Sequence, residues 1–137
     1  SNYPLYSEGT FTGTFEGTTS GSVSTGSQNY VRIGNQVTFY ISFSGDLSTL
    51  VGDIYITGLP KLSGTIQDGA VAAVSHGNGI SYPTGGGTHP VTLLAVTAGQ
   101  EIKFSFNDDN GDRITLSDSD ISGTSHIFEI TMTYRIE

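Results

Sequence analysis

The stretch GTFTGTFEGTTSGSVSTG, residues Gly9 to Gly26, decides the fold. Gly, Thr and Ser dominate it, which is also the composition of a flexible linker. Its odd positions, however, carry Phe11, Phe15 and Val23 among the glycines, whereas its even positions are almost all Thr or Ser. A linker has no reason to sort apolar groups onto one parity, but a strand with one buried face does. The pattern predicts an extended strand with these three side chains buried, and a disordered Gly/Ser tract is the alternative.

The length and composition indicate one β-rich domain. A chain of 137 residues fits a single core, so we expect one domain over residues 1–137. Nineteen Gly and only 13% charged residues indicate many turns, and seven Tyr and seven Phe suit half-buried pleated surfaces. We interpret the start at Ser-Asn as a cut from a longer protein, of which this chain is the C-terminal fragment.

The charge excludes two classes of partner. The formal net charge is −8 with five Lys and Arg in total, whereas binding to a phosphate backbone draws most of its free energy from these residues. We therefore expect neither nucleic acid nor an anionic membrane surface as a partner. No run approaches the roughly 18 apolar residues of a membrane span, so no membrane insertion is expected. The absence of Cys excludes disulfides and Cys-ligated zinc.

Short alternating segments continue along the chain. Val37, Phe39, Ile41 and Phe43 share one parity after a turn at Gly34-Asn35, and the last segment, His126 to Ile136, alternates in the same way. Further strands are expected at residues 29–33, 53–57, 70–74, 91–97, 101–106 and 113–117. About nine or ten short strands with turns between them predict an antiparallel β-sandwich of jelly-roll type.

Three pieces of the sequence resemble the C-terminal tip domain of bacteriophage tail fibres and related prophage virion proteins. The first comprises EGTFTGTFEGTTSGSVS from Glu8 and YVRIGNQVTFYISFS from Tyr30; the second is GDIYITGLP from Gly52. The third is ITLSDSDISGTSHIFEITMTYRIE from Ile114. Gly13 stands where the family tends to have Pro, and residues 62–100 match no quoted motif.

The resemblance implies a receptor-binding domain at the distal tip of a virion tail fibre. It implies attachment to the host cell through a surface glycan or protein receptor, and a homotrimer. The Gly-notched opening strand offers little apolar surface within one subunit, so packing between chains would supply burial. The alternatives are a non-catalytic carbohydrate-binding module and a purely structural virion domain.

The receptor site is expected in the Gly-rich segment Ser75–Pro90. An aromatic ring stacks on the C–H face of a sugar, and Asn and His side chains hydrogen-bond hydroxyl groups. The alternative is a well-packed loop without a ligand. The candidate residues are His76, Asn78, Tyr82 and His89.

We expect no metal and no cofactor. The acidic residues Asp108, Asp109, Asp112, Asp118 and Asp120 lack the spacing of an EF-hand, and Asn110-Gly111 by itself indicates a tight hairpin. The three histidines lack metal-ligand spacing within one chain. On a threefold axis, however, one inward-facing His126 per chain would supply three imidazoles.

We expect no enzymatic activity. The sequence has no Cys and no G-x-S-x-G elbow, which leaves carboxylate pairs as the remaining catalytic option. The glutamates Glu16, Glu101, Glu129 and Glu137 are scattered, and nothing singles out an acid and a base.

Overall fold

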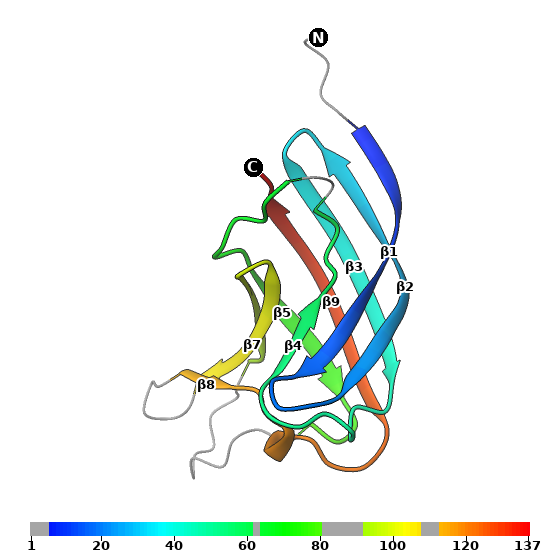
Figure 1. Cartoon of the computed structure of the whole chain (residues 1–137), viewed down its shortest axis with the longest axis vertical. Helices are drawn as coiled ribbons and strands as arrows, with labels where there is room; N and C mark the ends of the chain where they lie inside the picture. Colours follow the sequence, from blue (N-terminus) through cyan, green and yellow to red (C-terminus); the bar gives the residue numbers. More distant parts are fainter. Residues whose placement is uncertain (1–5, 62–63, 81–91, 108–112) are drawn as a thin grey trace.

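The computed structural model describes residues 6–61, 64–80, 92–107 and 113–137. These residues form nine β-strands and a short 3-10 helix, η1 (Asp118–Asp120) (Figure 1). The strands are β1 (Tyr6–Gly17), β2 (Ser22–Ile33), β3 (Gln36–Gly45), β4 (Ile54–Thr57), β5 (Val71–Gly77), β6 (Leu94–Ala98), β7 (Glu101–Asn107), β8 (Arg113–Thr115) and β9 (His126–Arg135). Among the described residues, no helix has the length and apolar character needed to cross a lipid bilayer.

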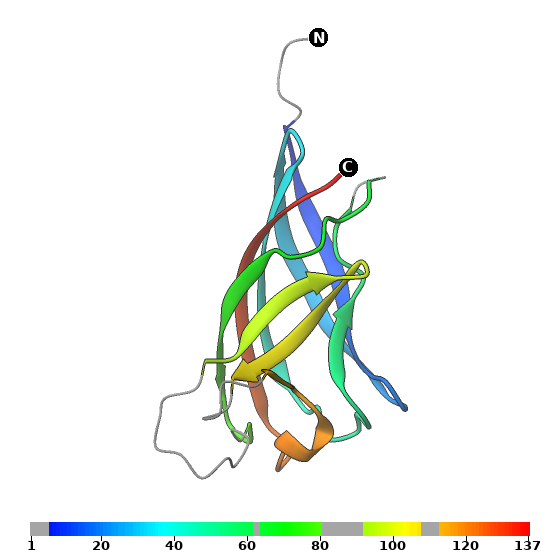
Figure 2. The same cartoon turned by 90° about the vertical axis from the view of Figure 1, so that its left-hand side faces the viewer.

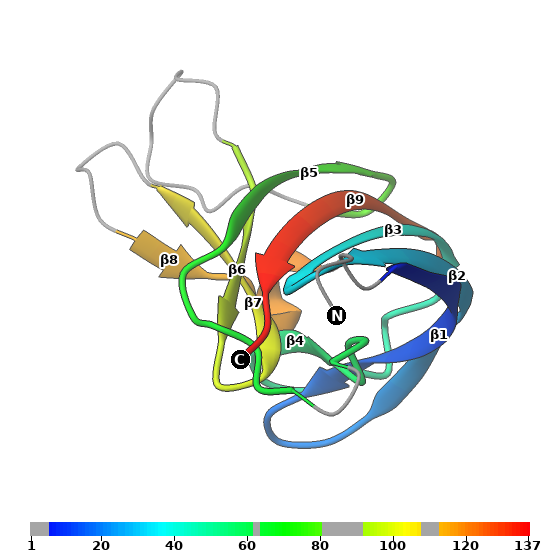
Figure 3. The same ribbon diagram turned by 90° about the horizontal axis from the view of Figure 1, so that it is seen from above.

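Eight of the described strands close into an antiparallel barrel. Their order is β4-β1-β2-β3-β9-β5-β6-β7, and β7 pairs in turn with β4. Seen from above, the strands form a ring (Figure 3). The ninth strand, β8, pairs with the C-terminal half of β7 on the side opposite β6. The predicted jelly-roll sandwich is therefore wrong: the protein is all-β, but one sheet closes on itself.

Closure depends on a short seam between β4 and β7. Tyr55 pairs with Lys103, and Ile56 pairs with Ile102. The Lys103 Nζ atom lies 4.8 Å from the centre of the Tyr55 ring, close enough for a cation–π contact. The long strands β1, β2, β3 and β9 twist and tilt as they cross the molecule, which brings the two ends of the sheet together (Figure 1).

The stretch from Gly9 to Gly26 forms a hairpin. Strand β1 ends at Gly17, β2 begins at Ser22, and Phe15 pairs with Val23 across the hairpin. The extended conformation and the buried parity are thus confirmed, but the single long strand is wrong. Phe15 is fully buried, whereas Phe11 and Val23 are only half-buried.

Gly17 allows the chain to approach its own backbone closely. A Cβ atom at this position would lie 2.4 Å from the Val51 carbonyl oxygen. The same oxygen accepts hydrogen bonds from the Thr19 and Ser20 amides, and the Val51 amide donates to the Ser20 carbonyl. The space left by the missing side chain of Gly17 is therefore filled by a segment of the same chain.

The barrel interior is packed with aromatic rings. Phe15 lies 4.7 Å from Phe43, 5.3 Å from Phe128 and 6.4 Å from Phe104, measured between ring centroids. All four rings are buried. The opening strand therefore buries its central Phe within its own chain, which removes the physical reason for expecting burial between chains.

Candidate functional site

The described part of the predicted loop site, residues 75–80, lies beside the segment that carries η1: the Ser122 amide donates to the Gly79 carbonyl oxygen, and Ile80 pairs with Ile121. The C-terminal end of β5 and η1 lie at the same end of the barrel (Figure 2). His76 is near the end of β5, and Asn78 follows the strand directly. The other two candidates, Tyr82 and His89, lie outside the described residues. His76 faces inward beside the buried Phe128 and is half-buried. Asn78 has a φ angle of 55°, a left-handed backbone conformation that Asn adopts more readily than most residues and that lets the chain turn after β5.

Burial gives His76 a predicted effect on stability. Desolvation lowers the pKa of His76 below its usual value of about 6.5. Between that usual value and the lower folded value, the unfolded chain binds more protons, so the free energy of unfolding falls as the pH falls. We expect His76→Gln to reduce the difference in Tm between pH 8 and pH 5, measured by circular dichroism. An unchanged difference would contradict the proposed effect of burial.

His126 joins two connecting segments inside the fold. Its side chain is fully buried, and Nδ1 accepts a hydrogen bond from the Leu47 amide at 3.0 Å. Nε2 therefore carries the proton and donates to the Ser122 carbonyl oxygen at 2.9 Å. Both ring nitrogens are used within the chain, so the idea of a threefold metal site at His126 is wrong.

The structure describes two of the five acidic residues, Asp118 and Asp120. Asp108, Asp109 and Asp112 lie outside the described residues, as do Asn110 and Gly111. The strands that flank them, β7 and β8, do pair as a hairpin, with Asn107 opposite Arg113. Asp118 and Asp120 belong to η1, where the Asp120 carboxylate accepts a hydrogen bond from the Ser117 amide. The described residues contain no group of three acidic, His or Cys side chains placed to hold a metal ion.

A row of outward-facing residues crosses four neighbouring strands. Thr10 on β1 pairs with Asn29 on β2, Asn29 pairs with Tyr40 on β3, and Tyr40 pairs with Thr131 on β9. All four side chains are exposed, and Tyr40 is 44% exposed. With neighbouring strands about 4.8 Å apart, the row spans about 14 Å. Strand pairing, rather than a loop conformation, therefore fixes these positions.

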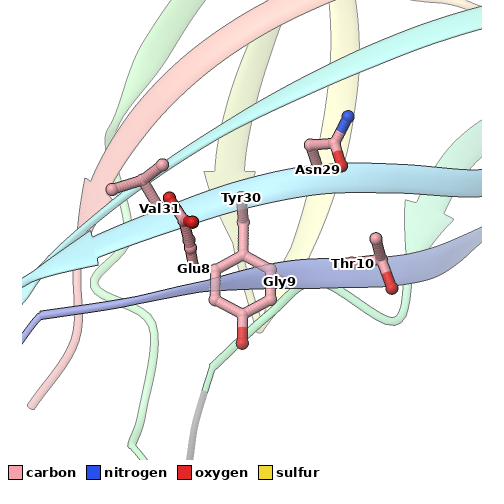
Figure 4. A pocket seen from close by; sticks show the side chains of 6 residues that line it. All are labelled: Glu8, Gly9, Thr10, Asn29, Tyr30 and Val31. Atoms are coloured by element: carbon pink, nitrogen blue, oxygen red, sulfur yellow. The ribbon is translucent and has the colours of Figure 1, made fainter.

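The first depression beside this row lies on β1 and β2. Its lining residues are Glu8, Gly9, Thr10, Asn29, Tyr30 and Val31 (Figure 4). The Tyr30 ring extends across β1 at Gly9, where an added Cβ would lie 3.2 Å from the Tyr30 hydroxyl oxygen, whereas Asn29 and Val31 point away from that ring. Glu8 accepts a hydrogen bond from the Tyr6 hydroxyl at 2.7 Å, and the resulting interaction with Glu8 raises the pKa of Tyr6.

Two further depressions continue across the barrel. The second reaches from Asn29 and Val31 to Tyr40 and Thr131. The third, of about 450 Å³, is lined by Tyr40, Ala73, Val74, Ser75, Glu129 and Thr131. Because the second and third depressions share Tyr40 and Thr131, whose side chains face outward, they form one shallow channel over β2, β3, β9 and β5, which we call the outer trough. Tyr40 lies between these two depressions.

The outer trough combines one exposed aromatic ring with short polar side chains. Thr38 and Thr133 lie next to the row, and their hydroxyl oxygens are hydrogen-bonded at 2.8 Å. The lining offers hydroxyl, amide and carboxylate groups from Thr131, Asn29 and Glu129. Such a surface can stack a flat apolar face on Tyr40 and hydrogen-bond polar groups around it.

The sequence prediction missed the outer trough. Tyr40 shares the polar parity of its strand with Thr38 and Ser42, while the other parity carries the buried residues. The signal in the sequence was an aromatic residue, Tyr40, at an exposed position of the alternating pattern. Its alignment with Asn29 and Thr131 depends on strand pairing between distant segments, which alternation alone does not give.

No protein-family model matches the chain, and no curated protein matches it.

Proposed function

We propose that this domain binds a cell-surface saccharide along the outer trough, as the attachment domain at the distal tip of a bacteriophage tail fibre. The observation that carries the saccharide part is the row Thr10–Asn29–Tyr40–Thr131, with an exposed aromatic ring at its centre. The phage part of the proposal, including a homotrimer, rests on the sequence resemblance.

The chemistry of the outer trough suits a saccharide better than an apolar peptide. Sugars present C–H faces that stack on an aromatic ring and hydroxyl groups that exchange hydrogen bonds with Asn, Thr and Glu. Tyr40 supplies the ring, and exposed Thr and Asn side chains flank it on both neighbouring strands. A short oligosaccharide lying across the strands would contact the whole row.

The strand scaffold also favours binding. Residues held in a paired sheet lose little further conformational entropy when a ligand binds, whereas a loop must first be ordered. Tyr40 and Thr131 belong to β3 and β9, which pair over ten consecutive residue positions. The proposed site is therefore preorganised.

Replacing Tyr40 by alanine tests this proposal. We expect the affinity for an oligosaccharide to fall about tenfold, equivalent to about 1.4 kcal/mol, because the stacking surface is lost. A glycan array of bacterial-surface oligosaccharides identifies the ligand, and isothermal titration calorimetry measures its affinity. Tyr55→Ala is the matched control, since Tyr55 lies at the β4–β7 seam outside the outer trough.

Two outcomes would contradict the proposal. One is that the domain binds none of the oligosaccharides on the array. The other is that Tyr40→Ala and Tyr55→Ala change the affinity equally, which would place the binding surface elsewhere on the barrel.

A further inference from the structure

We infer that the third depression of the outer trough receives an ammonium group, so that the bound saccharide contains an amino sugar with a free amine. This inference rests on the proposed function and specifies its ligand class. It depends on the placement of Tyr40 and Glu129, two exposed residues that line the same depression.

Strand register brings the Tyr40 ring and the Glu129 carboxylate to one place. Tyr40 pairs with Thr131, and Glu129 lies two residues along β9 on the same outward face. Diagonal neighbours of this kind are about 7–8 Å apart and within reach of an aromatic and a long side chain. Ser75 on β5 pairs with Glu129 from the other side and also lines the depression.

The Glu129 carboxylate has no cationic partner among the described residues. The salt bridge found there joins Lys103 to Glu101. No Lys or Arg lines either depression of the outer trough. No hydrogen bond to the Glu129 side chain is formed within the described part of the chain. The third depression therefore presents a negative charge that the described residues do not neutralise.

An ammonium group complements these three side chains. It donates up to three hydrogen bonds, for which Glu129 and Ser75 supply acceptors, and a cation is attracted to the face of an aromatic ring. An anionic sugar would instead meet the Glu129 carboxylate in a chain whose net charge is −8. A neutral N-acetyl group would gain hydrogen bonds but no charge pairing.

Three tetrasaccharide probes separate these cases. They are glucosamine tetrasaccharide with free amines, the same oligosaccharide fully N-acetylated, and galacturonic acid tetrasaccharide, each titrated calorimetrically at a pH at which the amines are protonated. We expect the free-amine probe to bind about tenfold more tightly than the N-acetylated probe, and the galacturonate probe to bind most weakly. Raising the salt concentration should reduce the preference, because salt screens exposed charges.

Glu129→Gln tests the assigned residue. We expect it to abolish the preference, so that the free-amine and N-acetylated probes bind with equal affinity. Glu16→Gln is the matched control, because it removes the same charge from a residue that pairs with Tyr55 on β4, outside the outer trough. It should retain the full preference. Circular dichroism melts check that both variants fold.

The outcomes distinguish this inference from the proposed function. If the free-amine and N-acetylated probes bind equally and Tyr40→Ala weakens both, the ammonium assignment is wrong and saccharide binding stands. A preference for galacturonate, or a preference that survives Glu129→Gln, also overturns the assignment. If no oligosaccharide binds, including those on the glycan array, the proposed function fails and the assignment fails with it.

Discussion

Replacing Phe15 by alanine is expected to lower the free energy of unfolding by about 3–5 kcal/mol. Phe15 is fully buried at the centre of the barrel, where its ring packs against Phe43, Phe128 and Phe104. Truncation leaves a cavity between strands that approach from different sides of the barrel, so the surrounding rings cannot collapse fully into the space. This loss is a large part of the 5–15 kcal/mol that stabilises a typical domain.

Urea unfolding monitored by circular dichroism measures this effect. Thr12→Ala is the control, because Thr12 is an exposed residue on the same strand, and its effect should stay within about 0.5 kcal/mol. Equal losses for the two variants would show that the odd positions of β1 do not form the buried face.

Replacing His126 by phenylalanine is expected to lower the free energy of unfolding by about 2–4 kcal/mol, although the ring volume is largely kept. The substitution leaves the Leu47 amide and the Ser122 carbonyl without their hydrogen-bond partner. The buried Leu47 amide left unpaired costs about 1–3 kcal/mol, and loss of the part-buried hydrogen bond to the Ser122 carbonyl adds about 0.5–1.5 kcal/mol. The segment after β3 and the segment before β9 lose their common anchor as a result.

Chemical denaturation of His126→Phe gives the total loss, and amide hydrogen exchange locates it. The Leu47 amide should exchange faster relative to amides in the middle of β3. Thr131→Ala, an exposed substitution on the same strand, should leave both measurements nearly unchanged. Wild-type stability and Leu47 protection in His126→Phe would contradict the anchoring role.

Alternation in the sequence revealed the buried face of the opening stretch but concealed its turn. Phe15 and Val23 face each other across the β1–β2 hairpin and both occupy odd positions. The turn residues from Thr18 to Gly21 have the same composition as the strands. Because the alternation of residues continues through the turn and the composition does not change there, the sequence does not indicate where the turn lies. The pattern therefore predicts one strand where the structure has two.

The inward parity changes later, within β2. The pairing of β1 with β2 shifts between Thr12 and Thr14, and Gly26 adopts a φ angle of 76° there. Beyond this irregularity the even residues Gln28 and Tyr30 face inward. A β-bulge of this kind follows from pairing with another strand, which a period-two pattern does not report.

The alternation of residues within each strand likewise does not distinguish a sandwich from a barrel. Both folds bury one face of every strand, so residues such as Ile56 and Ile102 are apolar in either case. What distinguishes the barrel is the pairing of these two residues across the β4–β7 seam. That contact joins segments far apart in the sequence.

The central claim is that the outer trough is the saccharide-binding surface, and backbone amide chemical-shift mapping tests it most directly. Titration of the isotope-labelled domain with the tightest-binding oligosaccharide should shift the amide signals of Asn29, Tyr40 and Thr131, which lie in one row across three strands. Shifts confined to His76, Asn78 and the segment that follows them, with the signals of that row unchanged, would contradict the claim.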